Sequence, residues 1–240
     1  METSLIVNPC YAASLGGCDK KRSGEHYVSE TLLRAIGDQI RVQGLPWCLT
    51  PRELPVQALT ANVLCSRHNS LLSPLDDEAG RFFETLYRLH SGELGDFCKF
   101  DGAKIEQWML KVLCGIVAAG VTVYGRMTRG LPPIEVVGAV FGKTSLADGD
   151  GLRFIDTSQF GIHPLEVQIE AGLGTAAITG IAVSFAGVPF RVGIPGSSRK
   201  MTDGIPRPSL IRFEGKPVCG ITWRDNSDWV IDLSTRPIRR

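Results

Sequence analysis

The chain has almost no net charge, and this limits what its composition can indicate about function. Its 26 basic residues stand against 25 acidic ones, which leaves a formal net charge of +1 over 240 residues. A general attraction to nucleic acid is therefore lacking, and any contact with phosphate must come from local patches. Two basic stretches are candidates for such a patch, Lys20-Lys21-Arg22 and the terminal Arg236–Arg240. Either is compatible with an ordinary solvated surface, and that interpretation fits the tail better.

A long apolar run and a leader segment are also lacking. The most apolar stretch, Trp108 to Val123, is interrupted by Lys111 and is too short to span a bilayer. The N-terminus shows no charged region followed by an apolar one. Apolar residues nevertheless make up 43% of the chain, which is enough for a buried core. The sequence therefore predicts a globular, soluble and cytoplasmic protein without a membrane partner.

Motifs for nucleotide or calcium binding are incomplete. Gly142-Lys143-Thr144 is similar to the end of a phosphate-binding loop, but the first glycine of that motif would fall at Val137. Asp148-Gly149-Asp150-Gly151 lacks the later glutamate of a calcium loop and is better explained as a tight turn. A nucleophile elbow and a dinucleotide fingerprint are missing as well.

Cysteine and histidine, in contrast, form a pattern that suggests metal binding. Seven cysteines is an odd number, and without a leader segment it favours metal ligands over disulfides. Cys65 and His68 are three positions apart, so a tight turn can direct both toward one zinc ion. Cys10 and Cys18 can complete a Cys3His site. Their separation is wider than that of an ordinary knuckle, so Cys48 remains an alternative to either one.

A second group of polar residues accompanies this pattern. Glu25-His26 places a carboxylate beside an imidazole, and the run Asn62-Val63-Leu64-Cys65-Ser66-Arg67-His68-Asn69 has an asparagine at each end. Over residues 5–80 the chain thereby resembles the zinc-stapled form of the HNH (ββα-metal) endonuclease family. Members carry a cysteine pair, then Asp/Glu-His, then Asn-(apolar)-Leu-Cys-x-x-Cys followed by Asn or His. In this chain His68 stands in place of the last cysteine.

The resemblance implies a role for each of these residues. His26 would be the general base, Glu25 and Asn69 would hold a catalytic magnesium or manganese ion, and Asn62 would hold the loop that carries the base. The zinc would be separate and structural, and the substrate would be nucleic acid, with DNA expected. Neighbours in a strand point to opposite faces, so Glu25 and His26 can share a phosphate only where the strand bends, which Gly24 permits.

The expected fold class is α+β. An HNH-like, treble-clef-like ββα-metal unit stapled by zinc is predicted over residues 1–92, a helical connector over 93–119, and an antiparallel β-rich domain over 120–240. Ser73-Pro74 predicts the start of a helix, with Asp76 favouring its N-terminal dipole. A second helix is expected over 104–118, and a strand over Ile134–Val140.

Two function classes remain open. The first is the metal-dependent endonuclease. The second is a non-catalytic, zinc-stabilised binding or scaffold module, favoured by the near-neutral charge and by the long insertion between His26 and Asn62. The face around Glu25, His26 and Asn69 distinguishes the two, because an open cleft with a divalent ion favours the enzyme and a filled one favours the module. A small-ligand activity of the β-rich part has no motif behind it.

Overall fold

The computed structural model describes residues 10–42, 48, 50–93, 95–123, 126–128, 130–147, 150–155, 164–172, 177–194, 203–225 and 227–233. The terminal basic stretch and two residues of the expected turn at 148–151 lie outside this set. The described chain is mixed α+β, in agreement with the predicted class.

Two paired strands and a long helix organise the N-terminal part. Strand β1 (Arg22–His26) pairs antiparallel with β4 (Thr60–Cys65), and helix α2 (Ser66–His90) follows β4 directly. The register shifts at Gly24, where two residues of β4 face one residue of β1. The extra residue of this bulge therefore belongs to β4, and the bend of β1 that Gly24 permits remains a prediction.

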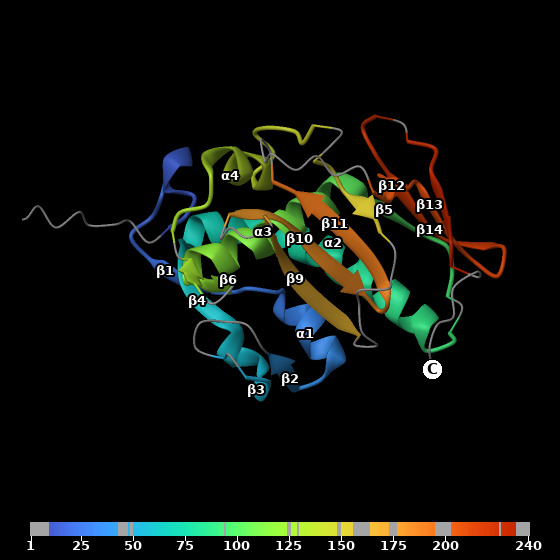
Figure 1. Cartoon of the computed structure of the whole chain (residues 1–240), viewed down its shortest axis with the longest axis horizontal. Helices are drawn as coiled ribbons and strands as arrows, with labels where there is room; N and C mark the ends of the chain where they lie inside the picture. Colours follow the sequence, from blue (N-terminus) through green and yellow to red (C-terminus); the bar gives the residue numbers. More distant parts are fainter. Residues whose placement is uncertain are drawn as a thin grey trace, which may run out of the picture.

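Shorter elements surround this unit (Figure 1). One 3-10 turn precedes β1, and the chain between β1 and β4 forms a helix, a hairpin and a second 3-10 turn. Their bounds are η1 (Ala13–Leu15), α1 (Glu30–Ile36), β2 (Gln39–Val42), β3 (Arg52–Pro55) and η2 (Val56–Leu59).

Helix α3 (Gly102–Ala119) lies at the centre of the molecule, behind the large sheet in Figure 1. Asp101 caps it, because its carboxylate accepts hydrogen bonds from the backbone N–H groups of Ala103 and Lys104. The predicted helix is confirmed and begins two residues early. Strand β5 (Cys98–Asp101) leads into it without a loop. Lys111 is buried in the middle of this apolar helix.

The C-terminal part is β-rich, as expected. A five-stranded antiparallel sheet has the order β12-β8-β11-β10-β9, and a four-stranded sheet has the order β15-β13-β14-β5. Most pairings are antiparallel, whereas β13–β15 and β14–β5 are parallel. The bounds are β6 (Val121–Val123), β7 (Arg126–Thr128), β8 (Arg153–Phe154), β9 (Leu165–Ala171), β10 (Ile178–Phe185), β11 (Val188–Gly193), β12 (Ile205–Pro206), β13 (Leu210–Phe213), β14 (Lys216–Thr222) and β15 (Val230–Asp232).

The strand predicted at Ile134–Val140 is wrong, because this segment forms helix α4. Pro133 enters the helix in an extended conformation and Glu135 lies in the first turn, which both favour a helix start. The valines that suggested a strand are buried where α4 packs against α3. Tertiary packing thus overrides the strand preference of β-branched residues.

The helix start predicted at Ser73 is also wrong. Helix α2 begins seven residues earlier, at Ser66, with Cys65 as its N-cap and Pro74 inside it. Ser73 and Pro74 are exposed, so the proline ring faces solvent rather than a packed neighbour. Asp76 therefore lies in the third turn of α2, where it has no capping role.

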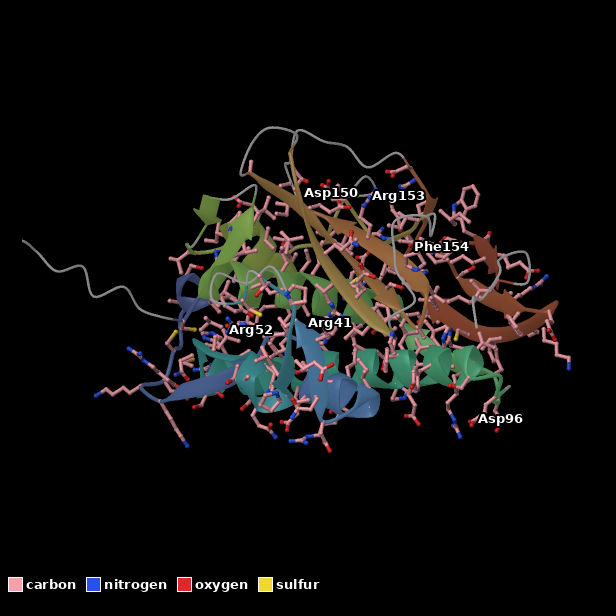
Figure 2. The ribbon with its side chains drawn as sticks, turned by 60° about the horizontal axis from the view of Figure 1, so that its bottom comes forward. Arg41, Arg52, Asp96, Asp150, Arg153 and Phe154 are labelled. Atoms are coloured by element: carbon pink, nitrogen blue, oxygen red, sulfur yellow. The ribbon has the colours of Figure 1, made fainter. Side chains whose placement is uncertain are left out.

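One hydrophobic cluster extends through all the described parts, from Cys10 to Leu233. Figure 2 shows the sheet of β9, β10 and β11 on one side and α2 on the other, with Asp150, Arg153 and Phe154 on the sheet side and Asp96 beyond the end of α2.

The domain boundaries expected after residues 92 and 119 remain a prediction. Among the described residues, no helix has the length and apolar character needed to cross a membrane.

Candidate functional site

Four of the residues expected to bind zinc come together at one end of β4. Cys10 and Cys18 flank η1, Cys65 ends β4, and His68 lies in the first turn of α2. Their ligand atoms all lie within 4.8 Å of one another. His68 Nδ1 is 3.2 Å from the Sγ atom of Cys65, 3.4 Å from that of Cys10 and 3.5 Å from that of Cys18. The group could hold a metal such as zinc.

The spacing of the cluster fits a tetrahedral ion. Zinc bound at its usual zinc–sulfur and zinc–nitrogen lengths holds the two ligand atoms about 3.6 Å apart, close to the three observed distances. A hydrogen bond between the His68 ring and the Gly16 backbone supports the tautomer in which Nδ1 faces the thiols. Phe141 packs edge-on against the same ring at 5.4 Å between centroids.

Proton chemistry at the cluster also suits metal binding. Burial lowers the pKa of His68, so its imidazole is neutral near pH 7 and can donate a lone pair. Burial raises the pKa of Cys10 to about 12. At Cys65 burial acts in the same upward direction, but hydrogen bonds from the backbone of His68 and Asp19 outweigh it, and the pKa is lowered. Cys65 is therefore readier than Cys10 to lose its proton.

Cys48 is not part of this group. Its thiol donates hydrogen bonds to the backbone oxygens of Val42, at 3.3 Å, and Thr50, at 3.4 Å. The wide gap between Cys10 and Cys18, which had left Cys48 as an alternative, is bridged by the turn η1.

A cleft of about 330 Å³ lies on the other side of β1. Strand β1, the start of α1, helix α2 and helix α3 all contribute to its walls. Its lining consists of Gly24, Glu25, His26, Ser29, Glu30, Thr31, Asn69, Ser73, Asp76, Asp77 and Lys111.

The cleft brings together three of the four residues assigned to chemistry by the sequence. Glu25 and His26 reach it from the end of β1, and Asn69 reaches it from α2, where its amide donates a hydrogen bond to Ser23 Oγ at 2.7 Å. Asn62 does not join them. It is exposed on β4 at the bulge and is absent from the cleft lining.

Lys111 is a member of the cleft that sequence reasoning missed. Its side chain is 3% exposed, and its Nζ lies 2.5 Å from Glu25 Oε1. The same Nζ lies 2.6 and 2.7 Å from the two carboxylate oxygens of Asp76. The available signal was that Lys111 is the single charge in the apolar run from Trp108 to Val123.

A hydrogen-bonded chain continues from this ion pair into the core. Asp76 Oδ1 also accepts a short hydrogen bond from Ser29 Oγ. Ser29 Oγ in turn accepts one from the indole N–H of Trp108, at 2.6 Å. Ser29 precedes α1 but its hydroxyl does not cap that helix. The side chains of Ser29 and Asp76, both interpretable from sequence as helix-start residues, instead hold the floor of the cleft.

His26 has the protonation state that a general base requires. Burial lowers its pKa, Lys111 and Arg34 act in the same direction, and Glu30, 3.8 Å from its Nδ1, acts against them. The imidazole is therefore neutral near pH 7. Its Nε2 is buried and has no hydrogen-bond partner within the described part of the chain. Burial raises the pKa of Glu25, and the ammonium of Lys111 opposes that shift.

No protein-family model, curated protein or solved structure matches this chain.

Proposed function

We propose that this chain is a metal-dependent, HNH-like endonuclease that hydrolyses phosphodiester bonds in nucleic acid. One observation carries the proposal: Glu25, His26 and Asn69 line a single cleft, and the Cys3His cluster lies close by, with Cys65 on β4, the partner strand of β1, and His68 on the same helix as Asn69. The order of β1, β4 and α2 supports the proposal, because a ββα-metal unit also consists of two antiparallel strands followed by a helix.

In this proposal His26 takes a proton from the attacking water as the oxygen–phosphorus bond forms and the bond to the leaving oxygen breaks. Glu25 and Asn69 are the oxygen donors available to hold a magnesium or manganese ion, which when bound supplies positive charge to the phosphate. A carboxylate and an amide in one cleft fit such an ion, because it keeps several waters and uses few protein ligands. Asn62 has no part in this scheme.

Substrate contact is assigned to the exposed basic stretch at the start of β1. Lys20, Lys21 and Arg22 are exposed, and Arg67 is exposed at the start of α2. They flank the metal cluster in sequence and precede the cleft residues by only a few positions. Because phosphate contacts supply most of the sequence-independent affinity for DNA, this patch suffices for a chain with little net charge.

The test is a cleavage assay on supercoiled and single-stranded DNA with the zinc-loaded chain and added magnesium or manganese. His26→Ala should lower the rate by about 10²-fold or more, the usual contribution of a general base. His90→Ala is the matched control, since His90 lies at the opposite end of α2, outside the cleft. Absence of metal-dependent cleavage, or equal rates for wild type and His26→Ala, would reject the proposal.

A second candidate is the zinc-stabilised binding or scaffold module. The observation that favours it is the ammonium of Lys111, which fills the space between Glu25 and Asp76 with a positive charge. If that ammonium always occupies the space between the two carboxylates, the cleft holds no divalent ion. The chain then serves to present its β-rich part. A divalent ion bound to the wild-type cleft separates the two candidates in favour of the enzyme.

A further inference from the structure

The buried lysine of the cleft is unusual in its setting. Lys111 comes from a largely apolar helix, and burying an ammonium there is costly unless negative charge compensates it. Glu25 supplies one carboxylate, 5% exposed, and Asp76 supplies another, 25% exposed. Both lie in direct contact with Nζ. The ammonium therefore occupies a cation site built by residues from β1 and α2.

The geometry of this site also suits a metal ion. An oxygen of Glu25 lies 2.5 Å from Nζ and an oxygen of Asp76 lies 2.6 Å from it, distances close to those of metal–oxygen bonds. A divalent ion held by both carboxylates would take the position of Nζ or would lie beside it. In either position it meets the positive charge of Lys111 at close range.

We propose that Lys111 is the resident cation of the cleft and sets its affinity for divalent ions by competing with them for Glu25 and Asp76. The inference builds on the proposed divalent-ion site and adds to it the carboxylate of Asp76 and the competing charge. Two carboxylates and one ammonium leave a net charge of −1 at the floor of the cleft. Without the ammonium the charge would be −2, and a divalent ion would bind more tightly.

The sign of this effect separates competition from simple structural support. If Lys111 only maintained the fold, replacing it would disorder Glu25 and Asp76 and weaken metal binding. If Lys111 competes, its neutral replacement strengthens binding. Removal of a unit charge within a few ångströms of a divalent ion corresponds to at least a tenfold change in affinity, even when solvent screens the pair.

The experiment measures Mn²⁺ binding to the zinc-loaded chain without nucleic acid, from the electron paramagnetic resonance signal of free Mn²⁺. Lys111→Gln should bind Mn²⁺ at least tenfold more tightly than wild type, and Lys111→Arg, which keeps the charge, should stay near wild type. Adding Asp76→Asn to Lys111→Gln should abolish the gain. Equal or weaker binding by Lys111→Gln, or an equal gain in Lys111→Arg, would overturn the inference.

Folding is monitored in the same samples by zinc content and thermal melting. Should Lys111→Gln unfold in the absence of Mn²⁺, the competition model requires that Mn²⁺ restores its melting transition at concentrations that leave wild type unchanged. Failure of Mn²⁺ to do so also overturns the inference. The readout is independent of cleavage, so an inactive chain with the predicted Mn²⁺ pattern would reject the proposed nuclease while leaving the role of Lys111 intact.

Discussion

The metal cluster and the cleft are built on the same strand pair and the same helix, yet they differ in how they balance charge. The cluster consists of three thiols and one imidazole, and their ligand atoms all lie within 4.8 Å of one another. The cleft is open and mixes carboxylates, a neutral imidazole and an ammonium. A closed set of soft donors is typical of structural zinc, whereas an open set of oxygen donors suits chemistry with exchangeable ligands. The two sites therefore differ in the kind of ion that their donors suit.

The largest effect is expected at the cluster. Cys65→Ala should abolish zinc binding and melt the β1–β4 pair with the first turns of α2, because a structural zinc site contributes about 10 kcal/mol to the folded state. Elemental analysis and circular dichroism provide the measurement. Cys48→Ala is the matched control, since that thiol bonds only nearby backbone oxygens and should leave zinc content unchanged. Full zinc content in Cys65→Ala would contradict the assignment.

A smaller loss is expected at the floor of the cleft. Lys111→Met leaves the buried carboxylate of Glu25 and the partly exposed carboxylate of Asp76 without their cation, and in buffer free of divalent ions it should lower the free energy of unfolding by about 3 kcal/mol. Zinc content should stay at the wild-type level, because Lys111 does not contact the cluster. Denaturant titration measures the change. If the variant loses its zinc together with its stability, the cluster and the cleft are one cooperative unit.

Acidification should affect the cleft through the titration of His26. The folded-state pKa of His26 is lowered below its usual value of 6.5, so cleavage should fall only as the pH drops through that lower value. Between the two values the unfolded chain binds more protons than the folded one, so stability also falls with decreasing pH.

Glu30 provides the comparison for this pH dependence. Its negative charge raises the pKa of His26, so Glu30→Gln should move the acidic limb of the rate profile to still lower pH. A limb above pH 6.5, or one that moves upward in Glu30→Gln, would contradict the assignment of His26 as the base.

The smallest effect is expected behind the cleft. Ser29→Ala removes the acceptor of the Trp108 indole N–H and one donor to Asp76, and it should cost about 1 to 2 kcal/mol of stability. Ser70→Ala is the control, because its exposed hydroxyl bonds only the Ser66 carbonyl within α2. Denaturant titration of both variants measures the difference. Equal stability for the two would show that the chain from Trp108 to Asp76 is not maintained in solution.

Local patterns in the sequence were enough to single out Cys65 with His68 and Glu25 with His26. Cys65 and His68 are one helical turn apart, and Glu25 and His26 are adjacent, so short-range spacing places them without knowledge of the fold. The same is true of helix α3, whose apolar residues and Asp101 cap are local signals. The N-terminal boundary of α2 could not be predicted in this way. Pro74 suggests a helix start, although it lies inside α2 with its ring facing solvent.

What the sequence determined alone is therefore the set of soft ligands, the Glu-His pair and the mixed α+β class. Only the tertiary structure decided that Asp76 pairs with Lys111 instead of starting a helix, that α4 forms where a strand was expected, and that Lys111 reaches Glu25 from 86 positions along the chain. The physical reason is burial. An isolated lysine in an apolar helix must find carboxylates, and which carboxylates it meets depends on how α3 packs beneath β1 and α2 rather than on any local pattern.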